Sequence, residues 1–126
     1  MPSNSVKEPK PIKILYVDGD ESYCFLVSEY LKKFEIDIVK DGRSALIKYN
    51  KSYDLAIIDV NLPDISGINV IKKLKSYNPD AKIIPIINEN TLDIDNYSNF
   101  LTKPFTESTL LQIIKHFNWH MSIKMI

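Results

Sequence analysis

Short apolar runs recur along this chain at residues 12–17, 35–39, 55–58, 83–87 and 100–102. Runs of this length between turn-forming residues are typical of β-strands. The run at 55–58 has four unbroken apolar residues, as expected of a strand buried on both faces in the centre of a parallel sheet. Pro85 lies inside the fourth run, and because proline cannot donate to a strand ladder, we expect a bulge or a weakly paired stretch there.

Apolar residues recur at helical spacing between the runs. The spacing predicts helices over about 21–33, around 44–49, from 68 to about 74, and from 106 or 108 to 117. Residues 88–98 carry only weak periodicity, and their Asn and Asp side chains compete with helix by bonding to their own backbone, so a short or irregular helix is predicted there. Because strands and helices alternate, the chain is predicted to be α/β, with a doubly wound parallel sheet covered by helices on both faces.

Length and charge limit the classes of partner. The chain has 126 residues, which suits one domain over 12–118 with tails at 1–11 and 119–126. Basic and acidic residues balance at 16 each, so no overall field favours nucleic acid, an anionic membrane or an acidic substrate. The single Cys24 excludes an internal disulfide, no apolar run approaches a membrane span, and residues 1–11 lack the apolar core of a secretory signal. We therefore expect a cytoplasmic protein without direct nucleic-acid contacts.

Charged residues stand where three predicted strands end. Asp18 ends the first strand, Asp59 the third, and Lys103 the fifth. Parallel strands bring their carboxyl ends to one edge of the sheet, where such folds bind ligands. Two neighbouring carboxylates need a cation, and Mg²⁺ accepts oxygen ligands of this kind, while a lysine neutralises added phosphoryl oxygens. The combination suits a carboxylate that attacks phosphorus, whereas the simpler alternative is that Asp59 is only a turn residue.

Four stretches together resemble a response-regulator receiver domain, from residue 12 to about 117. They are ILYVD at 14–18, DGRSAL at 41–46, YDLAIIDVNLPDISG at 53–67 and FLTKPF at 100–105. The resemblance implies a flavodoxin-like sheet of strand order 2-1-3-4-5, in which Asp59 accepts a phosphoryl group from a phosphohistidine. It also implies that Asp18, Asp59 and the backbone carbonyl of Asn61 hold Mg²⁺, that Lys103 contacts the phosphoryl oxygens, and that the Lys103–Pro104 bond is cis.

The implied partners are a histidine kinase or a histidine phosphotransfer protein, and a downstream protein. The resemblance implies no enzyme activity beyond the domain's own phosphoryl transfer and hydrolysis. A monomer or a weak homodimer is expected.

Two departures from the family pattern stand out. The family usually places two adjacent acids after the first strand, but the second position here is Gly19, so Mg²⁺ is expected to bind weakly. Asp20 is a possible substitute ligand, although its simpler role is to cap the following helix. At the end of the fourth strand, where the family has a Thr or Ser that signals phosphorylation, this chain has Ile87 or Asn88. Phe100 occupies the position of the family's switching aromatic, with a buried strand residue as the structural alternative.

Three function classes follow. The first is a receiver that accepts phosphoryl groups and acts by binding partners. The second is a pseudo-receiver, a protein-binding module that Gly19 and the missing hydroxyl leave unphosphorylated. The third is a flavodoxin-like enzyme or cofactor binder, which the acidic residues 18–21 argue against because a phosphate-binding loop needs N–H donors rather than carboxylates.

Overall fold

The computed structural model describes residues 11–88 and 99–117. Its elements are, in order, β1 (Lys13–Val17), α1 (Glu21–Tyr30), β2 (Glu35–Val39), α2 (Gly42–Lys48), β3 (Leu55–Asp59), α3 (Gly67–Tyr77), β4 (Ile83–Ile87), β5 (Leu101–Thr102) and α4 (Glu107–Phe117). Every strand pair is parallel, and the five-stranded sheet has the order β2-β1-β3-β4-β5. The predicted doubly wound α/β fold and its strand order are confirmed.

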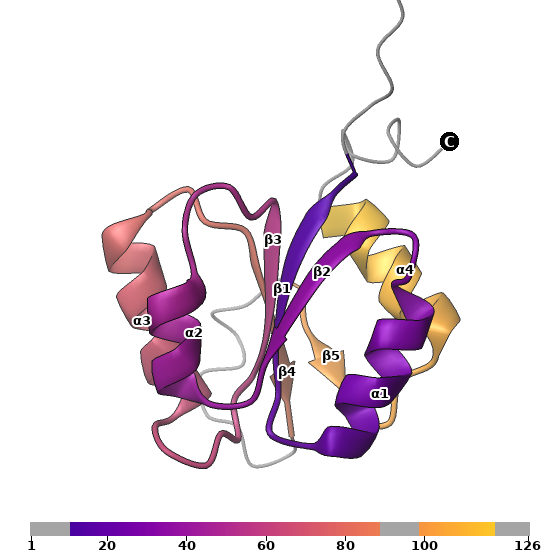
Figure 1. The fold of residues 1–126 in the computed structure, drawn as a ribbon, viewed down its shortest axis with the longest axis horizontal. Coiled ribbons are helices and arrows are strands. Elements are labelled where there is room, and N and C mark those ends of the chain that lie inside the picture. Colours follow the sequence, from indigo (N-terminus) through magenta and orange to yellow (C-terminus); the bar gives the residue numbers. More distant parts are fainter. Residues whose placement is uncertain (1–10, 89–98, 118–126) are drawn as a thin grey trace, which may run out of the picture.

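Helices cover both faces of the sheet. Figure 1 shows α2 and α3 on one side of the sheet and α1 and α4 on the other. Successive side chains of a strand point to opposite faces, so Ile14 and Tyr16 of β1 pack with the α1 and α4 residues, whereas Leu15 and Val17 pack with those of α2 and α3. Burial on both faces explains why the central strands consist of unbroken apolar residues.

The first helix is shorter than predicted. It ends at Tyr30, and the N–H of Leu31 donates to the carbonyl of Val27 as the chain leaves the helix. Leu31 is fully buried and Phe34 is half-buried, and both pack into the apolar core between the sheet and the helices α1 and α4. The apolar spacing predicted a helix to residue 33. After Tyr30, however, it reflects contact of the side chains with the core and not a helical backbone.

Of the two alternatives predicted at Pro85, the bulge is wrong, whereas weak pairing is found on the β5 side. β3 and β4 pair without an inserted residue, and Pro85 lies opposite Ile58. The carbonyls of Lys82 and Ile86 accept hydrogen bonds from the N–H groups of Ala56 in β3 and of Val60 directly after it. By strand alternation the nitrogen of Pro85 therefore faces the β5 side. Pairing with β5 begins only at Ile86, and the missing N–H of Pro85 therefore removes no bond from the β3–β4 ladder.

Some predictions fall outside the described residues. These are the short or irregular helix, apart from Asn88, and nearly all of both tails. Within residues 11–88 and 99–117, no helix combines the length and apolar character needed to cross a membrane.

Gly67 places the start of α3 against the end of β3. A Cβ at this position would lie 2.1 Å from the carbonyl oxygen of Asp59 and 2.5 Å from the Cα of Val60. The N–H of Gly67 also donates to the carbonyl of Val60 at 2.9 Å. The close approach of two backbone segments thus requires glycine here and fixes the backbone that carries Asp59.

We expect Gly67→Ala to lower the free energy of unfolding by about 2–3 kcal/mol, because the methyl group displaces the backbone of Asp59 and Val60. Urea unfolding followed by circular dichroism measures the loss. Gly19→Ala is the control, since its Cβ would meet Pro63 Cδ at 3.3 Å and requires only a small shift. Equal stability of the two variants would contradict the close-approach argument.

Candidate functional site

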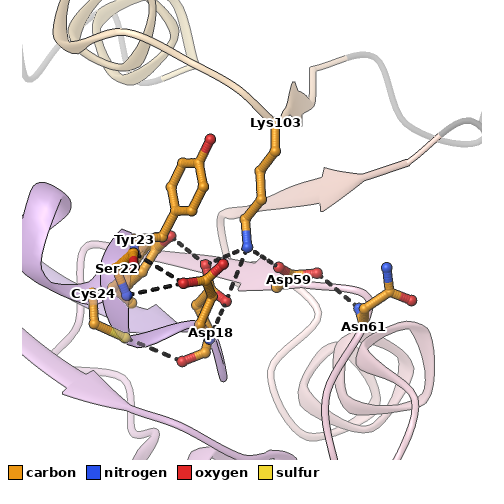
Figure 2. Close-up of polar contacts among 9 residues, drawn as sticks. Asp18, Ser22, Tyr23, Cys24, Asp59, Asn61 and Lys103 are labelled. Atoms are coloured by element: carbon orange, nitrogen blue, oxygen red, sulfur yellow. Dashed lines mark hydrogen bonds and ion pairs between the residues drawn. The ribbon is translucent and has the colours of Figure 1, made fainter.

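Asp18, Asp59 and Lys103 meet at the carboxyl end of the sheet. In the β1–β3 register Val17 lies opposite Ile58, so the following residues, Asp18 and Asp59, are neighbours. Lys103 Nζ lies 2.9 Å from Asp18 Oδ2 and 2.8 Å from Asp59 Oδ2, and Figure 2 shows this ammonium between the two carboxylates. β4 separates β5 from β3, so the lysine side chain reaches across one strand. The predicted convergence of the three residues is confirmed.

Burial of the two aspartates changes the pKa values at this site. Asp18 is 1% and Asp59 5% exposed, and they are the only buried charged residues in the described part of the chain. Burial raises the pKa of Asp59 above its usual value, although the hydrogen bonds from Lys103 and from the Asn61 N–H oppose the rise. Burial alone would lower the pKa of Lys103, but its bonds to Asp59 and Asp18 outweigh burial and raise that pKa. The two carboxylates therefore hold the lysine in its charged form, and its single positive charge balances one of their two negative charges.

The loop after β3 is fixed at both ends. The N–H of Asn61 donates to Asp59 Oδ1 at 2.8 Å. Asp64 accepts from the N–H groups of Gly42 and Arg43 at 2.7 and 2.9 Å, and Ser66 caps α3. Partial desolvation alone would raise the pKa of Asp64, but these backbone bonds outweigh it and lower the pKa. Asp64 thus ties the loop that carries Asn61 to the first turn of α2.

Asp20 caps helix α1, which was the simpler of the two roles predicted for it. Its Oδ1 accepts from the N–H groups of Ser22 and Tyr23 at 2.9 and 3.3 Å, which satisfies free donors at the start of α1. Gly19 contributes no carboxylate. Across the described ranges, no group of three or more His, Cys, Asp or Glu side chains could hold a metal ion.

The donor set nevertheless fits Mg²⁺. Asp18, Asp59 and Asn61 all line one open cavity, and the two aspartates bring carboxylate oxygens to it. Mg²⁺ commonly binds through one or two carboxylates and keeps several waters. These three residues are therefore the ones that would hold the ion.

The cavity above the carboxylates has a volume of about 680 Å³. It is lined by Asp18, Gly19, Asp20, Asp59, Asn61, Ile86, Ile87, Asn88, Thr102 and Lys103. Ile87 is buried and has no polar side-chain atom, so the hydroxyl expected from the family pattern is missing at that position. Phe100 lies before β5 and is only half-buried, so the alternative of a buried strand residue is wrong for it. The Lys103–Pro104 bond is cis, as the resemblance implied.

Two tyrosines at the site were not identified from the sequence. The hydroxyl of Tyr16 donates to Asp18 Oδ2 at 2.7 Å, and burial together with this bond raises the pKa of Tyr16. The ring of Tyr23 lies 4.4 Å from Lys103 Nζ and also contacts Phe105, with ring centroids 5.1 Å apart. Tyr16 shares a strand face with Asp18 because they are two residues apart, so alternation carried a signal for it. The contact of Tyr23 with Lys103 depends on how α1 packs against the sheet, and the sequence pattern does not predict this packing.

Replacing Lys103 by methionine is expected to cost roughly 3 kcal/mol of stability at neutral pH, because it leaves two buried carboxylates without their cation. Removal of the ammonium raises the pKa of Asp59 further, so the folded variant binds protons more tightly than the unfolded chain. The deficit should therefore shrink as the pH falls from about 7 toward about 4. Denaturant unfolding of both proteins across this range measures it.

Lys40→Met is the matched control, because Lys40 makes an ion pair of the same 2.8 Å length with Glu21 at an exposed position. Exposed pairs contribute little, so this variant should remain close to the wild type. A deficit in Lys103→Met that does not change with pH would contradict the role assigned to the buried carboxylates.

Comparisons with known proteins place this arrangement in a family. The chain is 32% identical over 105 residues to the uncharacterized transcriptional regulatory protein YrkP of Bacillus subtilis, and 31% identical over 124 residues to the transcription factor prr1 of Schizosaccharomyces pombe. These matches cover 78% and 91% of the chain but only 46% and 23% of the respective relatives, so the chain spans less than half of either protein.

Solved structures agree with these matches. The response regulator protein TrrA of Thermotoga maritima, in complex with Mg²⁺ and BeF, matches with a TM-score of 0.72 and 31% identity over 83% of this chain and 97% of that one. A crystal structure of the histidine kinase ThkA in complex with TrrA matches with a TM-score of 0.73 and 30% identity, covering 84% of this chain and 97% of the matched one. The family model described as the response regulator receiver domain matches residues 14–115, and the chain therefore belongs to the receiver-domain family of two-component response regulators.

Proposed function

We propose that this receiver domain accepts a phosphoryl group on Asp59 from a phosphohistidine of a kinase or a relay protein. The observation that carries the proposal is the bridge of Lys103 between the buried carboxylates of Asp18 and Asp59. Such a bridge places a nucleophile and a cation at one point of an open cavity, which phosphoryl transfer requires. The proposal assigns the domain no other enzyme activity and keeps its expected location in the cytoplasm.

In the proposed transfer, an Asp59 carboxylate oxygen forms a bond to phosphorus while the P–N bond of the phosphohistidine breaks. The electron pair of that bond stays on the imidazole nitrogen, which takes a proton from solvent. The N–H of Asn61 holds Oδ1 of Asp59, and Lys103 holds Oδ2, so the carboxylate is oriented before the donor arrives. As charge builds on the phosphoryl oxygens, Lys103 moves from the carboxylates to those oxygens and neutralises them.

Mg²⁺, held by Asp18, Asp59 and the Asn61 carbonyl, would supply further positive charge to the phosphoryl oxygens. The chain's own residues limit how well this ion is held. Gly19 contributes no oxygen, Asp20 is engaged at the start of α1, and Lys103 occupies both carboxylates when no phosphoryl group is present. We therefore propose that Mg²⁺ binds weakly.

The proposed partners follow from the relatives. TrrA, which this chain resembles, forms a complex with the histidine kinase ThkA, and this supports a histidine kinase as the phosphoryl donor. A downstream protein partner, and a monomeric or weakly dimeric state, remain proposals of the same kind. The alternative is a pseudo-receiver that binds partners without phosphorylation, which Gly19 and the apolar Ile87 favour.

Incubation with acetyl phosphate and Mg²⁺ is expected to add one phosphoryl group to the wild type and none to Asp59→Asn. Intact-mass spectrometry measures the adduct, and treatment with hydroxylamine should remove it because acyl phosphates react with this nucleophile. An adduct of equal yield in Asp59→Asn would refute Asp59 as the acceptor. No adduct in the wild type would favour the pseudo-receiver.

Gly19→Asp is expected to tighten Mg²⁺ binding by about five- to 150-fold, because one charged oxygen ligand contributes on the order of 1–3 kcal/mol. A Cβ at Gly19 meets Pro63 Cδ at 3.3 Å and the Lys40 carbonyl at 3.4 Å, so crowding opposes part of this gain. Gly19→Ala measures the crowding alone. Calorimetric titration that gives Gly19→Asp and Gly19→Ala the same affinity would rule out the missing-ligand argument.

A further inference from the structure

Tyr16 sits in the core of the fold but directs its hydroxyl at the site. Its side chain is fully buried among apolar residues between the sheet and the α1 and α4 helices. Two residues further along the same strand face lies Asp18, whose Oδ2 accepts the hydroxyl proton at 2.7 Å. A phenylalanine would fill the same volume without this bond, so packing alone does not require the hydroxyl.

The Asp18 carboxylate receives donors from three sources. Oδ2 contacts the Tyr16 hydroxyl and Lys103 Nζ, at 2.7 and 2.9 Å. Oδ1 contacts the backbone N–H of Asp20 at 2.9 Å and Lys103 Nζ at 3.1 Å. Each oxygen therefore has one donor that belongs to the fixed part of the fold and one that comes from the lysine. Because Asp18 is almost completely buried, solvent does not readily replace a lost donor.

Loss of the lysine bonds is built into the proposed function, on which this inference rests. When Lys103 is displaced from Asp18 by Mg²⁺, or turns to the phosphoryl oxygens, the Tyr16 hydroxyl is the side-chain donor that remains on Asp18 among the contacts described above. Without it, Oδ2 would keep none of the protein donors described above, and only the Asp20 N–H on Oδ1 would still hold the carboxylate. An oxygen in that position is costly, and a metal ligand that rotates binds its ion poorly.

We propose that Tyr16 is a positioning residue for Asp18: its hydroxyl fixes the carboxylate once Lys103 has left, and thereby supports Mg²⁺ binding at a site with one acid fewer than usual. Tyr16 does not touch the phosphoryl group and acts only through Asp18. In the metal-free protein Lys103 also contacts Oδ2 of Asp18. Loss of the Tyr16 hydroxyl therefore destabilises the metal-bound protein more than the free one.

The test is a Mg²⁺ titration of the full chain by amide NMR, following the N–H signals of Asp20 and Asn61. Tyr16→Phe is expected to bind Mg²⁺ about tenfold more weakly than the wild type, at the lower end for loss of a partner that orients a ligand. Tyr53→Phe is the matched control, because it removes a hydroxyl bond of 2.6 Å to another carboxylate, Asp37, away from this site. The control should lose stability but keep wild-type Mg²⁺ affinity.

The outcomes separate this proposal from the proposed function. Wild-type or tighter Mg²⁺ affinity in a folded Tyr16→Phe would overturn the positioning role and leave phosphorylation of Asp59 untouched. Absence of Mg²⁺ binding by the wild type would overturn both. An equal loss of affinity in Tyr53→Phe would mean that stability, not Asp18, controls binding, and would also overturn the proposal.

A second measurement needs no substitution. In wild-type protein labelled with carbon-13 at the tyrosine Cζ atoms, the Tyr16 hydroxyl should exchange slowly with solvent both without and with Mg²⁺. Faster exchange upon addition of Mg²⁺ would mean that the hydroxyl leaves Asp18 as the metal binds, and would contradict the proposal even if Tyr16→Phe does not fold.

Discussion

The ammonium of Lys103 between two buried carboxylates is the interaction on which the site depends. Asp18 and Asp59 are less than a tenth exposed, and two such charges side by side repel strongly where solvent is excluded. One lysine that contacts both offsets part of this cost, although burial still leaves the pKa of Asp59 raised. The parallel sheet makes the contact possible, because its register places the two acids next to each other and β5 brings the lysine to the same edge.

Most of the fold and the charged part of the site were predictable from the sequence. Apolar runs identified the strands, and the position of Asp18, Asp59 and Lys103 at strand ends identified their meeting point, because parallel strands leave no other edge for them. The resemblance to receiver domains supplied the strand order and the cis bond at Pro104. These features depend on the local sequence and on the order of the elements, and both can be inferred from one amino-acid sequence.

The errors and omissions share a physical cause. The prediction of a bulge at Pro85 was wrong because the pattern does not tell which neighbour the missing N–H faces. The end of α1 was misplaced because Leu31 and Phe34 keep contact with the core after the helix stops. Tyr16 was taken as a core residue because apolar runs count its ring and ignore its hydroxyl. In each case the deciding fact is the direction of a group in three dimensions.

The charge balance of the site connects these observations. In the usual family pattern three acids face one lysine, whereas here two acids face one lysine, with Asp20 turned to the start of α1. A lysine that neutralises half of the charge of the pair competes with Mg²⁺ more effectively than one that neutralises a third. In the proposed function this competition favours the free state over the metal-bound state. The bond from Tyr16 to Asp18 is proposed to act in the opposite direction, because it would persist when the lysine leaves. In the proposed function, these two contacts on a single carboxylate, Asp18, therefore act on the Mg²⁺ affinity in opposite directions.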